Sequence, residues 1–303
     1  MRVSVLIPTF RRTESFARAA RSVFAQRGVT DIELIAIDNS PEGSALETFA
    51  TLTQAAPISF RWAHAPTPGV AHARNAAIVL AEGCFVAWLD DDEEASPTWL
   101  AELLAVREAT GAQSVFGPVR AKAPAGTAHA GFFEKLYTRA GAPYSGRIHG
   151  AYGIGNSLQP RAMFDETAPF DVAANETGGE DDRLFASWAE AGAHFAWAAQ
   201  ALVTEHLEPT RVTLKHGLKR AFAYGQGPCE TAWARRDYAA LARHMSIGGA
   251  QAALYGAASA VCALPAPERA LAFADRAARG AGKVLWFKPQ RFYGAALAAR
   301  QPA

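Results

Sequence analysis

The stretch Phe85-Val86-Ala87-Trp88-Leu89-Asp90-Asp91-Asp92-Glu93-Glu94 joins an apolar run directly to five consecutive acidic residues. The apolar half predicts a buried strand, and Thr98, just after Pro97, marks the expected start of a helix. Five like charges at the end of a core strand repel one another and need a compensating cation. A divalent metal that carries a phosphate group would supply it, because Mg²⁺ and Mn²⁺ prefer carboxylate and phosphate oxygens. The alternative is a solvated acidic loop whose charges suit the dipole of the following helix.

Three further strands precede this stretch, separated by helical patterns. Apolar runs at residues 3–7, 32–37 and 58–62 predict the strands. Apolar residues at helical spacing follow each of them and predict the intervening helices. Strands that alternate with single helices predict an α/β fold, with a mainly parallel sheet flanked by helices.

Polar residues follow these strands at one edge of the predicted sheet. Pro8 and Thr9 end the first strand, Asp38 ends the second, and the acidic run ends the fourth. Ligands of such sheets bind at the carboxyl ends of the strands. The strand ends therefore predict a binding site and favour the metal over the solvated loop.

The first strand-to-helix turn excludes a dinucleotide site. Residues 8–12 contain no glycine, so they cannot form the close-approach turn of a GxGxxG loop, and no Walker lysine motif is present. Phosphates must then be held mainly by metal and arginines.

The middle of the chain adds a second acidic pair. Residues 121–150 are rich in Gly, Pro and Ala and predict a loose connection that covers one side of the site, and residues 152–158 predict a strand punctuated by glycines. Gly178 and Gly179 then precede Glu180 and Asp181, which open a helix whose dipole keeps carboxylates ionised. Plain helix capping is the alternative for this pair. A last strand at 195–203 ends in Thr204-Glu205-His206.

Composition excludes several classes of protein. The net charge of +1 implies no nucleic-acid partner. Cys84, Cys229 and Cys262 form no CxxC pair, which argues against a disulfide framework or a zinc site and for a reducing compartment. Residues 2–8 read as a strand rather than as a signal peptide.

Together these motifs resemble the family 2 glycosyltransferases, whose fold is called GT-A, over roughly residues 1–225. The motifs that carry the resemblance are residues 5–9, 38–40, 69–75, 89–92 and 178–181. More narrowly, residues 87–93, 116–119 and 219–226 look like those of bacterial glucosyltransferases that assemble succinoglycan-type exopolysaccharides on a lipid carrier.

The resemblance implies an inverting transferase that moves a hexose, expected to be glucose, from a UDP-sugar to a lipid-linked oligosaccharide or glycan acceptor. It assigns the nucleotide sugar to six positions of this chain, with Asp91 mainly a spacer: Pro8, Thr9, Asp38, Arg74, Asp90 and Asp91. It assigns Mn²⁺ or Mg²⁺ to Asp92, with Asp90 on the ribose or on the metal through water.

The resemblance also assigns the chemistry and the acceptor. Asp181 is the expected general base, with Glu180 beside it in the catalytic pair. Asn156 and Gly179 are the expected acceptor contacts. Asp182 leaves open which carboxylate faces the acceptor.

Some positions depart from the family pattern. His206 is the candidate for a further metal ligand, with Glu205 as a second candidate, but an alignment through Arg211 puts Thr204 in that place. The other reading of this segment is an exposed polar strand end. Arg211 and Arg220 are candidates to reach the diphosphate, or else belong to a solvated helix face.

The C-terminal quarter predicts helices. We expect a GT-A catalytic domain over residues 1–228 and a helical extension over residues 229–303. Residues 245–264 carry no charge but consist mostly of Ala and Gly, so their tendency to insert in a bilayer is marginal. Basic residues interleaved with aromatic ones between Arg276 and Tyr293 favour peripheral membrane contact, at the cytoplasmic face of the cell membrane. A helical hairpin packed on the catalytic domain is the alternative.

Two other classes of function stay open on the sequence alone. A nucleotidyltransferase shares the α/β layout and an acidic metal site, although the missing glycine-rich loop counts against it. A nucleotide- or glycan-binding protein without catalysis is the second, and the intact Asp90, Asp92 and Asp181 argue against it.

Overall fold

The computed structural model describes residues 2–164, 168–175, 178–288 and 290. The chain divides into two compact units, Met1–Lys122 with Thr138–His206, and Ala123–Tyr137 with Leu207–Ala303. Residue 228, where we expected the domain boundary, lies within a continuous helix, α7 (Leu214–Ala234), so the compact units are divided elsewhere. The assignment of residues 1–228 as the catalytic domain stays a prediction.

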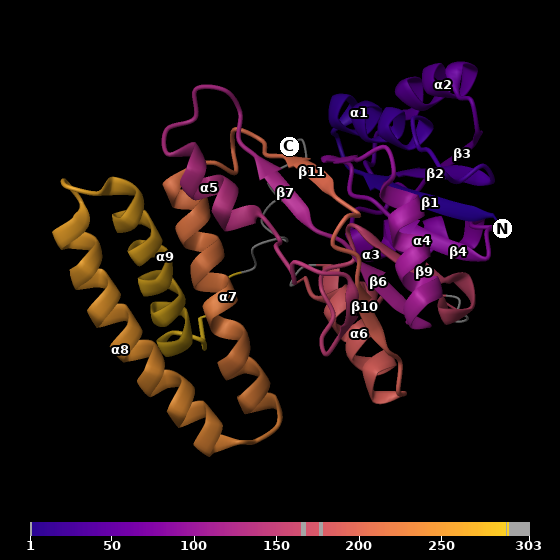
Figure 1. Cartoon of the computed structure of the whole chain (residues 1–303). Helices are drawn as coiled ribbons and strands as arrows, with labels where there is room; N and C mark the ends of the chain where they lie inside the picture. Colours follow the sequence, from indigo (N-terminus) through magenta and orange to yellow (C-terminus); the bar gives the residue numbers. More distant parts are fainter. Residues whose placement is uncertain (1, 165–167, 176–177, 289, 291–303) are drawn as a thin grey trace. The chain divides into compact units, whose positions relative to one another are not determined.

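The first unit is built on an eight-stranded sheet in the order β3-β2-β1-β4-β9-β6-β10-β8 (Figure 1). The four strands predicted from the first 90 residues form its parallel half: β1 (Val3–Thr9), β2 (Ile32–Asp38), β3 (Ser59–His64) and β4 (Phe85–Trp88). The other half is mixed, because β9 runs antiparallel to both of its neighbours: β6 (Ser114–Phe116), β8 (Gly146–Ile148), β9 (Ser157–Pro160) and β10 (Phe195–Trp197).

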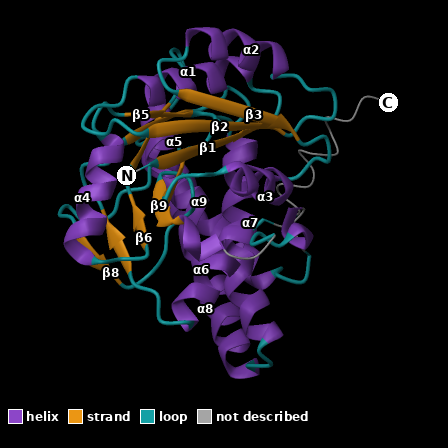
Figure 2. Cartoon of the chain, turned by 90° about the vertical axis from the view of Figure 1, so that its right-hand side faces the viewer, coloured by secondary structure: helices purple, strands orange, loops and turns teal. Residues whose placement is uncertain are grey.

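Helices cover both faces of the sheet, as the alternating pattern predicts (Figure 2). Successive side chains of a strand point to opposite faces, so Val5 and Leu6 of β1 enter two different apolar clusters. Helices α1 (Thr13–Phe24), α2 (Leu46–Ala55) and α4 (Trp99–Thr110) pack with Val5. Helices α3 (Val70–Leu80) and α6 (Glu180–Glu190) pack with Leu6. Two short 3₁₀ turns, Arg161–Phe164 and Val172–Asn175, complete this unit.

A second, three-stranded sheet corrects two expectations. Its order is β5-β11-β7, with β5 (Glu93–Ala95), β11 (Val203–His206) and β7 (Val119–Lys122). Glu93 and Glu94, which the sequence assigns to the loop after the fourth strand, therefore lie in a strand, because β11 pairs with them. The single strand expected at 195–203 is instead two strands in different sheets, separated by a turn in which Ala201 N–H donates to Ala198 O.

The region between β7 and β9 is more ordered than its composition predicts. Helix α5 (Ala130–Tyr137) and strand β8 fall inside the expected loose connection. The glycine-punctuated segment is irregular up to Asn156, which has a left-handed φ of 55°, and becomes a strand only at Ser157.

The second unit is helical, as predicted for the C-terminal region. Besides α5 and α7 it contains α8 (Tyr238–Cys262) and α9 (Pro267–Val284). Glycines let these helices approach closely: a Cβ at Gly225 would collide with the carbonyl of Arg279, and one at Gly282 with that of Phe222. Of the helices that the structure describes, none combines the length and the apolar character that crossing a bilayer requires.

Candidate active site

The acidic run links the two sheets of the first unit. It leaves the large sheet after Trp88 and enters the small sheet at Glu93. Asp91, Asp92 and Glu93 are only 6%, 5% and 4% exposed, so a solvated acidic loop is not what the chain forms here. Burial raises the pKa of Glu93 well above its usual value, and the neighbouring charge of Asp90 raises it further.

Arg12 supplies part of the compensating positive charge. Its Nη1 donates to Asp91 Oδ1 and to Asp92 Oδ2, both at 3.0 Å. Thr9 Oγ1 donates to Asp91 Oδ2 at 2.7 Å and ties the end of β1 to the end of β4. Burial raises the pKa of Asp91 to about 6, against the opposing effect of Arg12. The sequence prediction missed Arg12, although its place just after the first strand could have indicated it.

Asp90 lies among both acidic and basic groups. Burial raises the pKa of its carboxyl, the charges of Asp92 and Asp181 raise it further, and Arg74 and Arg139 oppose them. Asp90 and Asp181 are 91 residues apart in the sequence, and the fold brings them within electrostatic reach of each other. The predicted donor motif and the predicted base therefore belong to one site.

Asp181 is fixed at the start of α6. Its Oδ2 accepts the Ile154 N–H at 3.0 Å, and its Oδ1 accepts the Asp182 N–H at 3.0 Å. Asp182 itself is exposed. Of the two candidate bases, Asp181 is therefore the one whose carboxylate is held by backbone N–H groups.

Glu180 is bound to Arg74 in a buried ion pair. Burial raises the pKa of Glu180, and the charge of Arg74 only partly opposes this rise. The Arg74 guanidinium also lies over the Phe170 ring, 5.7 Å from its centroid. The pair fastens α6 to α3. Glu180 is thus engaged by Arg74 at the start of the helix, and the catalytic roles of Glu180 and Asp181 stay predictions.

Two predicted positions serve the local fold. Asp38 has no exposed surface, and its carboxylate accepts hydrogen bonds from Ser40 and from the Ala45 N–H. Asn156 is also fully buried; it accepts from Trp99 Nε1 at 2.7 Å and donates to Pro118 O and Ala201 O at 2.8 Å. The amide of Asn156 is thus hydrogen-bonded inside the protein, and its role as an acceptor contact stays a prediction. Nucleotide binding by Asp38 stays a prediction.

Three predicted positions remain, Pro8, Gly179 and His206. Pro8 is half-buried beside Thr9, and Gly179 is the half-buried residue before α6 with a left-handed φ of 83°. The backbone N–H of His206 donates to Asp92 O at 2.9 Å, but the Nε2 of its ring lies 2.9 Å from Glu94 Oε2. Their roles in donor, acceptor or metal binding stay predictions.

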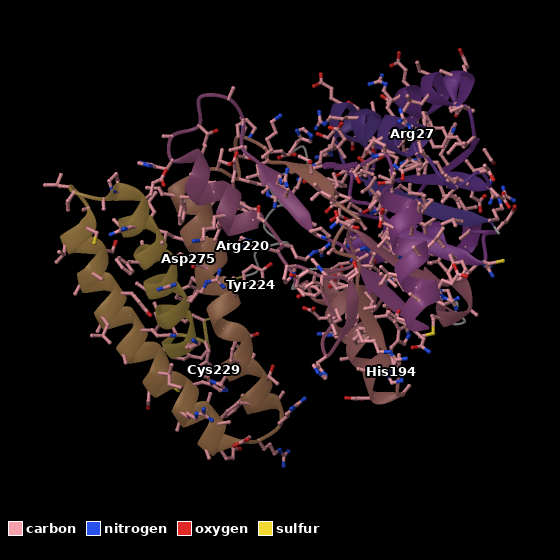
Figure 3. The ribbon with its side chains drawn as sticks, viewed as in Figure 1. Arg27, His194, Arg220, Tyr224, Cys229 and Asp275 are labelled. Carbon is pink, nitrogen blue, oxygen red and sulfur yellow. The ribbon has the colours of Figure 1, made fainter. Side chains whose placement is uncertain are left out.

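The predicted diphosphate arginines lie in the second unit. Arg211 and Arg220 flank the ring of Tyr137, at 4.7 and 4.8 Å from its centroid. Arg220 also lies 4.5 Å from the ring centroid of Tyr224, one turn further along α7 (Figure 3). Contact of either arginine with a diphosphate stays a prediction.

The donor set of the acidic run fits a hard divalent ion. Among the described residues, no three His, Cys, Asp or Glu side chains are grouped so that they could hold a metal. Mg²⁺, however, usually takes only one or two carboxylates from the protein and the rest from substrate phosphates and water. Asp90 and Asp92 offer two carboxylates two positions apart in the run. Asp90 and Asp92 therefore suit an ion shared with a diphosphate.

Comparison with protein families matches residues 4–164 to the family described as Glycosyl transferase family 2. The chain belongs to this family and is a glycosyltransferase. The acidic run lies inside the matched region, and Asp181 lies beyond it. This membership favours sugar transfer over the nucleotidyltransferase and over a protein without catalysis.

One curated relative extends over nearly the whole chain. The succinoglycan biosynthesis protein ExoM of Rhizobium meliloti (strain 1021) is 29% identical over 307 residues, which cover 97% of this chain and 96% of ExoM. The predicted likeness to succinoglycan-type enzymes is confirmed.

Solved structures support the fold. Residues 1–349 of S. aureus TarS in complex with UDP superpose with a TM-score of 0.52 at 16% identity, covering 72% of this chain and 64% of that one. The same fragment in complex with UDP-GlcNAc gives 0.51 at 17% identity, covering 69% and 59%. The chain thus spans less than two thirds of either fragment. The GT-A-type architecture predicted from the sequence is confirmed.

Proposed function

We propose that this glycosyltransferase is an inverting enzyme that moves a hexose, glucose in the first instance, from a UDP-sugar to a lipid-linked oligosaccharide or glycan acceptor of exopolysaccharide synthesis. The likeness to ExoM supports the process. The UDP and UDP-GlcNAc bound to TarS support a UDP-linked donor for a chain of this fold. The observation that carries the mechanism is that one short segment meets both acids: the Ile154 N–H donates to Asp181 Oδ2, and Gly155 packs against the Asp90 carboxylate.

Asp181 is the general base of the proposal. The acceptor hydroxyl oxygen attacks the anomeric carbon, the bond from that carbon to the phosphate oxygen breaks, and the electron pair leaves with UDP. The hydroxyl proton passes to the Asp181 carboxylate. A single displacement inverts the anomeric centre. The hydrogen bonds from the backbone N–H groups of Ile154 and Asp182 hold the carboxylate at the N-terminus of α6.

The acidic run receives the donor in this proposal. Asp92, with Asp90 beside it, would hold Mg²⁺ or Mn²⁺, which would supply positive charge to the departing diphosphate. Arg12 holds the Asp92 carboxylate at the strand end through its bond to Oδ2. The Thr9–Asp91 bond keeps the ends of β1 and β4 together.

The test compares neighbouring carboxylates. Purified protein with UDP-glucose and Mn²⁺ should release UDP slowly without acceptor and faster with it. We expect Asp181→Asn to keep nucleotide affinity and to lose about 10²–10⁴-fold in transfer rate, the usual contribution of a general base. Asp182→Asn, the exposed neighbour, is the matched control and should transfer normally. Normal transfer by Asp181→Asn would remove Asp181 as the base.

The metal and the donor are tested separately. Asp92→Ala should lose metal-dependent UDP release, and unchanged release would refute the metal assignment. A thermal-shift panel of nucleotide sugars, with and without Mn²⁺ or Mg²⁺, identifies the base, the sugar and the ion. A larger shift with another nucleotide sugar than with UDP-glucose would replace the glucose proposal.

Peripheral membrane contact at the cytoplasmic face belongs to the same proposal, because a lipid-linked acceptor requires it. In the second unit, Trp233, Tyr238 and Phe287 are each more than half exposed, and Arg235 and Arg236 lie between the first two. Aromatic and basic side chains together suit a membrane interface. Cosedimentation with vesicles of anionic phospholipid should exceed that with zwitterionic vesicles. Equal and negligible binding to both would argue against the membrane contact.

A further inference from the structure

Arg139, like Arg12, is a charged residue near the site that the sequence prediction overlooked. Its backbone is fixed beside β7, since Arg139 N–H donates to Val119 O at 2.9 Å and Val119 N–H donates to Arg139 O at 3.1 Å. Its side chain reaches the glycine-rich segment before β9. There Nη1 donates to Gly153 O at 2.8 Å, and Nη2 donates to Gly155 O.

The same segment holds the catalytic carboxylate from its other side. Ile154, between the two carbonyls bound by Arg139, donates its N–H to Asp181 Oδ2 at 3.0 Å. A Cβ placed on Gly153 would lie 3.4 Å from Arg139 Nη1 and 3.7 Å from Asp181 Oδ2. The guanidinium and the carboxylate thus flank a single residue. One peptide group connects them, because Gly153 O and the Ile154 N–H belong to the same peptide bond.

Arg139 is also surrounded by acids. Burial lowers the pKa of its guanidinium, and Glu93, Asp90, Glu205 and Asp181 all oppose that effect through their charges. An arginine stays protonated in such surroundings, so it provides a permanent positive charge. Its Nε is buried and has no hydrogen-bond partner in the described part of the chain. The side chain is therefore held by its two Nη groups, and its Nε is shielded from solvent.

We propose that Arg139 is a positioning residue for sugar transfer: by binding Gly153 O and Gly155 O together, it fixes the Ile154 N–H that orients the Asp181 carboxylate. This inference rests on the proposed role of Asp181 as the base. Arg12 and Arg74 do not share this task, because they bind Asp91, Asp92 and Glu180 instead.

The geometry predicts which variants lose activity. Arg139→Met removes both hydrogen bonds and keeps an unbranched side chain. Misplacing a reacting group by about 1 Å costs about 10²-fold in rate. We expect kcat for transfer to fall by that order while the KM for UDP-glucose and the affinity for UDP stay at wild-type values. Arg139→Lys keeps the charge, but one ammonium cannot reproduce the planar pair of donors, so it should recover little of the lost kcat.

The control is a second arginine that binds a carbonyl. Arg147 on β8 donates through Nε and Nη2 to Thr110 O, at 3.3 and 2.9 Å, and is exposed. Arg147→Met should leave kcat and KM unchanged. UDP affinity and the melting temperature of each variant confirm that it is folded. If Arg139→Met does not fold, Arg139→Lys carries the test alone, and wild-type kcat in Arg139→Lys refutes the paired-donor role.

A double mutant separates this inference from the proposed function. If Arg139 acts through Asp181, Arg139→Met should not lower the residual transfer rate of Asp181→Asn any further. An additional loss of about 10²-fold in the double mutant would mean that Arg139 acts independently, and the inference fails. Full activity of Asp181→Asn overturns the proposed base itself. Full activity of Arg139→Met with an inactive Asp181→Asn overturns the inference alone.

Discussion

Gly155→Ala should damage the donor site, because Gly155 packs directly against the Asp90 carboxylate. A Cβ at this position would lie 2.8 Å from Asp90 Cγ and closer still to Oδ2. Real Cβ atoms do not approach so closely, so either Asp90 or the Gly155 backbone must move. Gly155 is bound by Arg139 through its carbonyl, and β9 begins two residues later. We therefore expect Asp90 to be displaced.

The magnitude follows from overpacking a filled site. Added carbon atoms in close-packed interiors cost about 1–3 kcal/mol. A carboxylate displaced by about 1 Å costs about 10²-fold in rate. We expect a lower melting temperature and a loss of UDP-glucose turnover of that order.

The matched control is Gly153→Ala, two residues earlier in the same segment. Its Cβ would meet Arg139 Nη1 at 3.4 Å and Asp181 Oδ2 at 3.7 Å, which are ordinary contact distances. UDP release and thermal unfolding of both variants measure the difference. Equal activity and stability of Gly155→Ala and Gly153→Ala would refute the claim that Gly155 confines Asp90.

Two further predictions concern stability. Burial alone would raise the pKa of Glu33, but hydrogen bonds from Ser4 Oγ, the Glu82 N–H and Arg61 lower it overall. Ionised Glu33 therefore stabilises the folded protein at pH values above its unfolded-state pKa. This stabilisation is lost as the pH falls through the folded-state pKa. Glu33→Gln should thus lose about 1–3 kcal/mol in urea unfolding at pH 7 and lose less in acid, and a pH-independent loss would contradict this. Trp99→Phe should cost about 1–3 kcal/mol because it leaves the buried Asn156 Oδ1 without its donor, and unchanged unfolding would count against that hydrogen bond.

The order of strands and helices in the first 90 residues was readable from the chain. Apolar runs with period two and helical spacing are local properties, and each strand end could be located to within a residue or two. Because carboxyl ends of parallel strands share an edge, Thr9 and the acids after Trp88 could be placed together without coordinates, and they are hydrogen-bonded.

Short irregular segments were not readable in the same way. Glu93 and Glu94 form a strand only because β11, more than 100 residues later in the chain, pairs with them. Asn156 looked like a ligand-facing polar residue, but Trp99 and two backbone carbonyls from other segments satisfy its amide. The partners of Glu93 and Glu94 and those of Asn156 are all distant in the sequence, and no local pattern indicates them.

The sequence by itself therefore determined the class of fold, the family and the run of acids at the end of β4, because these depend on local periodicity and on the order of motifs. The tertiary structure decided how that run is compensated. Arg12 binds Asp91 and Asp92, and Arg139 lies near Asp90 and Asp181. The physical reason is that a carboxylate's charge is balanced by whichever cation the fold brings within a few ångströms, and that distance depends on long-range packing rather than on neighbours in the chain.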